Sequence, residues 1–215
     1  MVIKYKVYKK VDFIVYYFNK QKIIPTELTF DNPYQLLIAV VLSAQCLDRR
    51  VNMVTPELFK HYPDFRALAT AKESDIYNLI KSISYPEVKS ERIINIAKTI
   101  HEQYNDTIPN NLEILTTIKG IGRKTANLVL GILYSRPGIA VDTHVARVSQ
   151  RLGLTKSTNP DIIESDLYKL FPQEYWVKIN PWFVIFGRYT CTAKNPQCIN
   201  CPMKEICCEV IKKKT

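Results

Sequence analysis

Glycine, acidic residues and long apolar runs are all scarce in this sequence of 215 residues. Only six glycines occur while 47% of the residues are hydrophobic, so the chain can bury a core and is not a disordered basic tail. The longest apolar run, residues 36–42, has seven residues, whereas a membrane-spanning helix needs about 20. Residues 1–10 contain four lysines but lead into no apolar block with a small-residue cleavage site. We therefore expect neither a membrane span nor a secretory signal.

The shortage of acidic residues leaves a strongly basic chain. There are 30 Lys and Arg against 20 Asp and Glu, a formal charge of +10. The excess is uneven: residues 1–26 and residues 119–151 each carry +5, whereas residues 27–118 carry −3. Such a balance favours nucleic acid as the partner, with an anionic membrane surface as the weaker alternative.

Alternating apolar and polar runs of the kind that form strands are also lacking, and the apolar spacing is helical almost throughout. Helices are predicted over residues 34–45, 48–61, 64–70, 73–83, 88–104, 112–118, 123–134, 143–152, 160–171 and 174–188. The fold class is therefore all-α. A Pro-Gly pair at residues 137–138 interrupts the helices and marks a domain boundary, whereas residues 1–25 could pack with either half. The expected domains are residues 26–136 and residues 1–25 plus 137–215.

A tight turn is predicted at residues 119–125, which read Lys-Gly-Ile-Gly-Arg-Lys-Thr between two helical patterns. Its two glycines allow positive φ and close approach to another surface. The turn leads into a helix N-terminus, where N–H groups and the helix dipole attract an anion such as phosphate. An ordinary turn between helices is the alternative. Lys124 lies in the first helical turn, where its charge opposes the dipole, so it is either a candidate nucleophile or a solvated surface lysine.

Asp142 stands between an apolar segment and an amphipathic helix, where it is expected to be the N-cap. A carboxylate fixed in this way could also stabilise positive charge on a substrate or activate a nucleophile, and the two roles are compatible. For His144, a core or capping histidine is the favoured interpretation.

Five of the six cysteines fall between residues 191 and 208. Four of them are spaced C-x6-C-x2-C-x5-C, with only one short C-x2-C pair, whereas zinc sites usually combine two short pairs. Four thiolates in one compact loop suit a cubane iron–sulfur cluster, so zinc and unligated cysteines are the weaker alternatives. The expected ligands are Cys191, Cys198, Cys201 and Cys207. Cys208 is interpreted as a bystander and Cys46 as a buried thiol.

Taken together, these motifs resemble endonuclease III, the iron–sulfur branch of the helix-hairpin-helix DNA glycosylases. The resemblance covers residues 34–208. It is carried by Leu-Ser-Ala-Gln at 42–45, Gly-Ile-Gly-Arg-Lys-Thr-Ala at 120–126, Val-Asp-Thr-His at 141–144, and Gly-Arg-Tyr-Thr-Cys at 187–191 with the four-cysteine spacing that follows.

The resemblance implies two helical domains with a cleft between them, a helix-hairpin-helix motif and a C-terminal cluster loop. It also implies a bifunctional base excision repair enzyme, a DNA N-glycosylase and DNA-(apurinic or apyrimidinic site) lyase that removes oxidised pyrimidines. Lys124 would attack the sugar C1′ of a flipped nucleotide, form a Schiff base and permit β-elimination, assisted by Asp142. Gln45 would enter the space left by the extruded base. The implied DNA-binding residues are Gln45, Tyr85, Gly120, Ile121, Gly122, Arg123, Thr125, His144 and Lys194.

The implied cofactor is one 4Fe-4S cluster, mainly structural. The implied partner is double-stranded DNA that contains damaged bases or abasic sites. We expect a monomer in the cytoplasm, associated with the nucleoid if the source is bacterial, and no membrane partner.

The sequence departs from the family pattern at three places. Lys119 stands where the family usually has proline, Tyr85 stands where a leucine wedge is common, and residues 195 and 197 are uncharged where basic residues are frequent. Two alternatives stay open at this point. One is a monofunctional mismatch glycosylase, although relatives of that kind lack a lysine at position 124; the other is a non-catalytic iron–sulfur DNA-binding protein.

Overall fold

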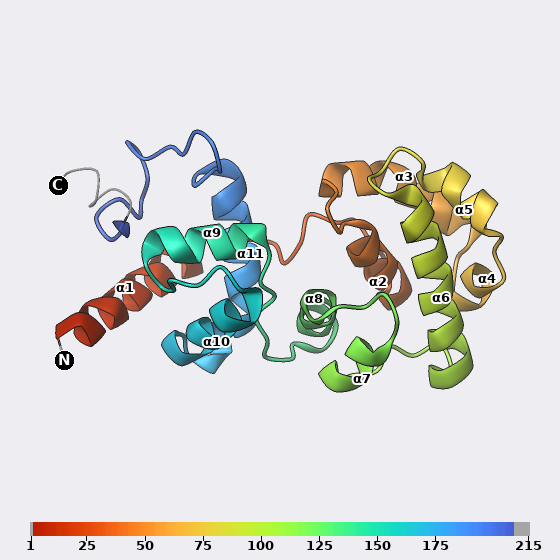
Figure 1. The fold of residues 1–215 in the computed structure, drawn as a ribbon, viewed down its shortest axis with the longest axis horizontal. Helices are drawn as coiled ribbons and strands as arrows, with labels where there is room; N and C mark the ends of the chain where they lie inside the picture. Colours follow the sequence, from red (N-terminus) through yellow and green to blue (C-terminus); the bar gives the residue numbers. More distant parts are fainter. Residues whose placement is uncertain (1, 209–215) are drawn as a thin grey trace. The chain divides into compact units, whose positions relative to one another are not determined.

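The computed structural model describes residues 2–208 of the chain, with side chains from residue 8 onward, and it contains no strand among these residues (Figure 1). This confirms the all-α prediction. The helices are α1 Val2–Asn19, α2 Pro33–Leu42, α3 Asp48–His61, α4 Phe65–Ala69, α5 Glu73–Ile80, α6 Pro86–Tyr104, α7 Leu112–Thr117, α8 Arg123–Tyr134, α9 Thr143–Leu152, α10 Pro160–Leu170 and α11 Trp176–Tyr189, with a 3-10 turn at Gln173–Tyr175. None of the described helices is both long and apolar enough to cross a membrane.

The chain divides into two compact units, each with its own hydrophobic core. We call Thr26–Tyr134 the hairpin unit, because it contains the turn between α7 and α8. The cysteine-loop unit consists of the described parts of Met1–Pro25 and Ser135–Thr215. The division after Tyr134 falls two residues before the one expected from the Pro-Gly pair. The reason is local: α8 ends at Tyr134, and Ser135 adopts a left-handed conformation with φ 51°.

The core of the hairpin unit is built around α2. Asn32 caps this helix by accepting a hydrogen bond from the Gln35 N–H, and Pro33 occupies the first turn. Eight of the ten residues of α2 are buried, because the helix is apolar on nearly every side. The predicted extension of this helix to Gln45 is wrong: α2 ends at Leu42, and Gln45 is left-handed with φ 53°.

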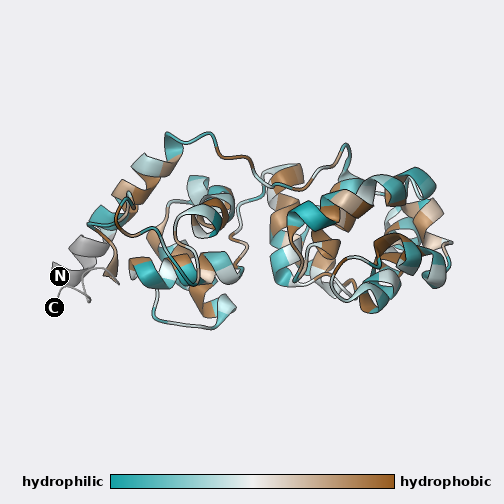
Figure 2. Cartoon of the chain, turned by 90° about the horizontal axis from the view of Figure 1, so that it is seen from above, coloured by the Kyte–Doolittle hydropathy of each residue, from teal (hydrophilic) through white to brown (hydrophobic). Residues whose placement is uncertain are grey.

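Most of the other predicted helices lie within three residues of their expected ends. The exception in type is the segment predicted over 174–188, where a 3-10 turn precedes α11. Figure 2 shows hydrophobic and hydrophilic residues interspersed along the helices of both units, as amphipathic packing requires.

The N-terminal helix α1 is the element that our sequence interpretation missed. Val11, Ile14 and Phe18 recur at helical spacing and are buried in the core of the cysteine-loop unit. The ring of Phe18 stacks on Trp182, with centroids 5.4 Å apart and an interplanar angle of 12°. The helical spacing of these three apolar residues could have predicted the helix, but the segment was interpreted by its lysines instead.

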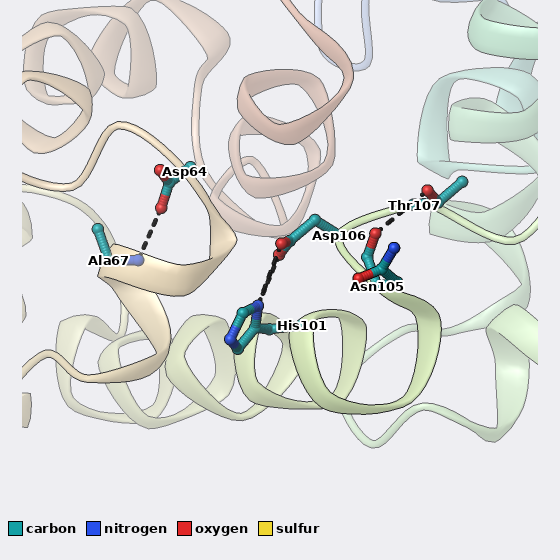
Figure 3. A network of polar contacts seen from close by, with 6 residues as sticks. All are labelled: Asp64, Ala67, His101, Asn105, Asp106 and Thr107. Atoms are coloured by element: carbon teal, nitrogen blue, oxygen red, sulfur yellow. Dashed lines mark hydrogen bonds and ion pairs between the residues drawn. The ribbon is translucent and has the colours of Figure 1, made fainter.

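The long helix α6 ends in two consecutive left-handed residues, Asn105 and Asp106. The Asp106 N–H donates to the Ile100 carbonyl over 3.2 Å, which closes the end of the helix. The Asp106 carboxylate lies 3.0 Å from His101 Nδ1, and the Thr107 hydroxyl donates to the Asn105 carbonyl (Figure 3). These side-chain contacts hold the turn that directs the chain toward α7 and the hairpin.

Candidate functional site

The turn between α7 and α8 depends on Gly120. The Ile121 N–H donates to the Ile118 carbonyl over 2.9 Å, and the Ile121 side chain is only 3% exposed, so it anchors the turn in the core. Gly120 has φ 102°, and a Cβ at this position would lie 2.5 Å from Cγ of Arg92. Both the backbone conformation and the available space therefore require glycine here.

Gly122 differs from Gly120. It is not left-handed, and a Cβ on it would meet no protein atom within 4 Å. The expectation that both glycines turn with positive φ is therefore correct only for Gly120. Neither backbone strain nor crowding within the protein accounts for glycine at position 122, which is exposed immediately before α8.

The first turn of α8 carries two exposed cationic side chains, Arg123 and Lys124, and no acidic residue. Positive charge at a helix N-terminus opposes the dipole at a cost of about 0.3–1 kcal/mol for each charge, whereas an anion at the same place is stabilised. This turn is thus arranged for an incoming anion rather than for the stability of α8. Thr125 is half-buried and Ala126 is buried, so the remainder of the turn faces the core.

Asp142 is the N-cap of α9, as its position in the sequence predicted. Its carboxylate accepts hydrogen bonds from the backbone N–H groups of His144 and Val145, both at 2.8 Å. The segment before it is held by two other helices: Asn180 of α11 donates to the Ala140 carbonyl over 2.7 Å, and the Tyr168 hydroxyl of α10 accepts from the Ile139 N–H. The half-buried carboxylate therefore has a fixed position at the start of α9.

His144 belongs to a network between α9 and α11. Arg147 Nη2 donates to His144 Nδ1 over 3.1 Å and to the Gly187 carbonyl over 2.9 Å. Burial lowers the pKa of His144 below its usual 6.5; Asp142 raises it, and the cations Arg147 and Arg188 lower it further. A hydrogen bond with the Gly187 backbone acts in the opposite direction and raises the pKa of His144, but the net effect is a lowered pKa that favours the neutral ring.

Two arginines of α9, which our sequence interpretation did not single out, hold the start of the cysteine loop. Arg147 Nε donates to the Cys191 carbonyl over 3.1 Å. Arg151 donates to the carbonyls of Thr192 and Ala193 over 2.8 and 3.0 Å, and its Nη1 lies 3.3 Å from Cys191 Sγ. Their spacing of four residues on one helix face was the only sequence signal, and it does not identify a partner 40 residues away. Lys194 follows these anchored carbonyls and is exposed.

The thiols of the loop share one neighbourhood. None of the six cysteines forms a disulfide. Burial raises the pKa of the Cys201 thiol, and the charges of Cys191, Cys207 and Cys198 raise it further, so all four groups act on the same site. Cys207 is only 8% exposed and packs with Met203 in the core of the unit.

This donor set fits an iron–sulfur cluster. Within residues 2–208 there is no group of three or more His, Cys, Asp or Glu side chains arranged to hold one metal ion. Four cysteine thiols within one loop are nevertheless a donor set that can hold an iron–sulfur cluster. Cys208 makes other contacts: its Sγ accepts from Lys10 Nζ over 3.1 Å, next to the end of α9.

Two exposed residues of the hairpin unit share an unusual backbone conformation. Gln45, after α2, has φ 53°, and Tyr85, before α6, has φ 57°. The left-handed region costs a non-glycine residue roughly 1–2 kcal/mol, and such residues are found where function requires them. Tyr85 is 61% exposed. The structure thus collects Lys124, the hairpin, Gln45 and Tyr85 in the hairpin unit, and Asp142, His144, Lys194 and the cysteines in the cysteine-loop unit.

Comparison with known proteins identifies the family. The family described as "HhH-GPD superfamily base excision DNA repair protein" matches residues 38–173, and the "iron-sulfur binding domain of endonuclease III" matches residues 191–207. Endonuclease III of Synechocystis sp. is 45% identical over 184 residues, which cover 84% of this chain and 83% of that protein. Endonuclease III of Rickettsia felis is 39% identical over 191 residues, 88% of this chain and 90% of that protein.

A solved structure of a trapped covalent intermediate of endonuclease III with DNA has a TM-score of 0.90 to this chain, with 36% identity and complete coverage of both. Fold and site together define a base excision repair enzyme of the helix-hairpin-helix class. The chain belongs to the endonuclease III family. It is a DNA glycosylase with abasic-site lyase activity, and it contains the iron–sulfur binding domain of that family.

The lowered pKa of His144 makes stability depend on pH. Because the pKa is lower in the folded protein than in the unfolded chain, the unfolded chain binds the proton first as the pH falls below about 6.5. We expect the free energy of unfolding of the cysteine-loop unit to decrease from pH 7.5 to pH 5.5, and to decrease less in His144→Asn.

Urea unfolding followed by tryptophan fluorescence measures this effect, because both tryptophans, Trp176 and Trp182, lie in α11 of the same unit. An NMR titration of the ring, assigned by its loss in His144→Asn, gives the pKa directly. A value at or above 6.5 would contradict the assigned environment.

Proposed function

We propose that the lysine at the first turn of α8 is the nucleophile of a reaction on oxidised pyrimidines in duplex DNA. Support comes from the exposed position of Lys124 beside Arg123, in a first helical turn that has no acidic residue. This turn begins directly after Gly122, a glycine that the protein's own packing does not require. The electrostatics of this turn suit a phosphate backbone. A backbone approaching from outside would use the open space at Gly122.

In the proposed reaction, Nζ of Lys124 attacks C1′ of a flipped nucleotide and the glycosidic bond breaks, so the base leaves with the bonding electrons. Loss of the amine proton and opening of the sugar ring give the Schiff base. Removal of a proton from C2′ then expels the 3′ phosphate by β-elimination. Asp142, a carboxylate held by two backbone N–H groups, would stabilise the cationic sugar and assist proton transfer from Lys124.

The proposed DNA contacts follow from the same geometry. Backbone N–H groups at the start of α8 would bind phosphate, as would the side chain of His144 and the exposed Lys194. Gln45 would fill the space of the extruded base, and Tyr85 would act as the wedge between base pairs. The residues assigned to the hairpin contact are Gly120, Ile121, Gly122, Arg123 and Thr125.

Cys191, Cys198, Cys201 and Cys207 would hold one 4Fe-4S cluster. The cluster would stabilise the loop that presents Lys194. The proposed substrate is double-stranded DNA with damaged bases or abasic sites, bound by a monomer at the chromosome in the cytoplasm.

Trapping with sodium borohydride tests the nucleophile. The wild-type protein, incubated with a duplex that contains thymine glycol or an abasic site, should form a covalent adduct, because borohydride reduces the Schiff base. Lys124→Ala should form none, while Lys72→Ala, which removes an exposed lysine at the N-cap of α5, should form as much as the wild type. Undiminished trapping by Lys124→Ala would reject Lys124 as the nucleophile.

The two roles of Asp142 can be separated by one substitution. Asp142→Asn retains an N-cap acceptor, so the free energy of unfolding should change by less than about 0.5 kcal/mol. Base excision should nevertheless slow by at least about 100-fold, because the negative charge is lost.

Asn159, which caps α10 through the N–H groups of Asp161 and Ile162, provides the matched control. Asn159→Ala should cost about 1 kcal/mol of stability with excision unchanged. An Asp142→Asn variant that excises within a few-fold of wild type would leave Asp142 as a cap only.

Two adjacent cysteines test the ligand assignment. Cys207→Ala should lose most of the bound iron and acid-labile sulfide, whereas Cys208→Ala should retain about four irons per chain, because Cys208 contacts Lys10 instead. Iron and sulfide analysis of the purified proteins measures both. Loss of iron from Cys208→Ala with retention in Cys207→Ala would reverse the assignment.

A further inference from the structure

A buried lysine, Lys89, lies in the first turns of α6 and takes no part in the proposed reaction. Only 2% of its surface is exposed, yet it carries an ammonium group. Its Nζ donates to the Leu42 carbonyl at the end of α2, over 2.8 Å. A lysine is almost never fully buried unless a specific partner holds it.

The end of α2 shows why this partner is needed. The carbonyls of Ala39 and Val41 accept from the N–H groups of Ser43 and Ala44, and the Val40 carbonyl accepts from the Ser43 hydroxyl. The last carbonyl, of Leu42, receives its hydrogen bond from Lys89. All four terminal carbonyls are thus satisfied, three by the turn itself and the fourth from α6. The positive charge also lies at the negative end of the α2 dipole.

The turn that Lys89 completes is the one that presents Gln45. The Cys46 N–H donates to the Ser43 carbonyl over 3.0 Å, and between these two residues Gln45 adopts its left-handed conformation and is exposed. Burial lowers the pKa of the Lys89 amine, the charge of a Cys46 thiolate would raise it, and Arg92 lowers it further. Lys89 therefore contacts the residue that ends α2, three positions before the strained Gln45.

The same residue is connected to the second strained position. The Lys89 backbone N–H donates to the Tyr85 carbonyl over 3.1 Å, the first hydrogen bond of α6. Tyr85, left-handed and exposed, precedes this helix. Lys89 thus joins two of the exposed left-handed positions of the hairpin unit, through its side chain to the turn that holds Gln45 and through its backbone to Tyr85.

We infer that Lys89 is a positioning residue for base extrusion: it fixes the Gln45 turn to the start of α6, so that the group filling the vacated space and the wedge are held in one geometry. The inference rests on the proposed function, because Gln45 and Tyr85 matter only where a base leaves the stack. The step that Lys89 would affect is extrusion of the damaged base. Excision of a damaged base requires extrusion of a paired nucleotide, whereas cleavage at a preformed abasic site begins with no base to remove.

Lys89→Met, which keeps the length of the side chain and removes its charge and donor, provides the test. Single-turnover rates are measured on two duplexes, one with thymine glycol and one with a preformed abasic site, at a temperature where circular dichroism shows full folding. Excision of thymine glycol should slow by about 10- to 100-fold, while abasic cleavage changes by less than about threefold. Lys98→Met, at an exposed position of the same helix, should leave both rates unchanged. If Lys89→Met does not fold, Lys89→Gln is measured in the same way.

A merely structural role is distinguished by combining Lys89→Met with Gln45→Ala. If Lys89 acts through Gln45, adding Lys89→Met to the Gln45→Ala protein should slow excision by less than about threefold. Full multiplication of the two effects, or equal slowing on both duplexes, would overturn the inference. A wild-type protein inactive on both duplexes would instead overturn the proposed function.

Discussion

The unpaired backbone groups at helix ends are the constraint on which this structure depends. With every described element helical, each turn must satisfy N–H groups on one side and carbonyls on the other. Asp142 does so at the start of α9, and Lys89 does so at the end of α2. The start of α8 is the contrasting case, because it carries cations where a stable helix would carry acids. The site residues are therefore groups that the helix ends hold in place or leave available for an anion.

The positive charge of the chain is divided between cations that stabilise the fold and cations that are exposed. The net charge of +10 indicates a polyanionic partner, but it does not locate the surface that binds. Within residues 119–151, which carry half of that excess, the cations have distinct roles. Lys124 is exposed on α8, whereas Arg147 is committed to the carbonyls of Gly187 and Cys191. Part of the basic character thus stabilises the cysteine-loop unit, and only the remainder is available to DNA.

Local signals made much of this predictable. Asn32-Pro33 marks the start of α2, the two glycines mark the hairpin, and the cysteine spacing marks the loop, because each depends on residues close in sequence. What could not be predicted depends on distant partners. From the sequence alone, Lys89 resembles an ordinary surface lysine, because its partner, the Leu42 carbonyl at the end of α2, lies 47 residues away in the chain. Helix α1 did have a local signal, the helical spacing of Val11, Ile14 and Phe18, and only its packing partner, Trp182, is distant in sequence.

The proposed active site depends on the identity of the attacking amine. With 21 lysines in the chain, a covalent adduct alone does not say which amine formed it. Proteolysis of the borohydride-trapped wild-type complex, followed by mass spectrometry of the peptide that carries the DNA remnant, identifies the residue directly. The remnant should be on Lys124, at the first turn of α8. A remnant on any other lysine or on the N-terminal amine would contradict the assignment of the active site.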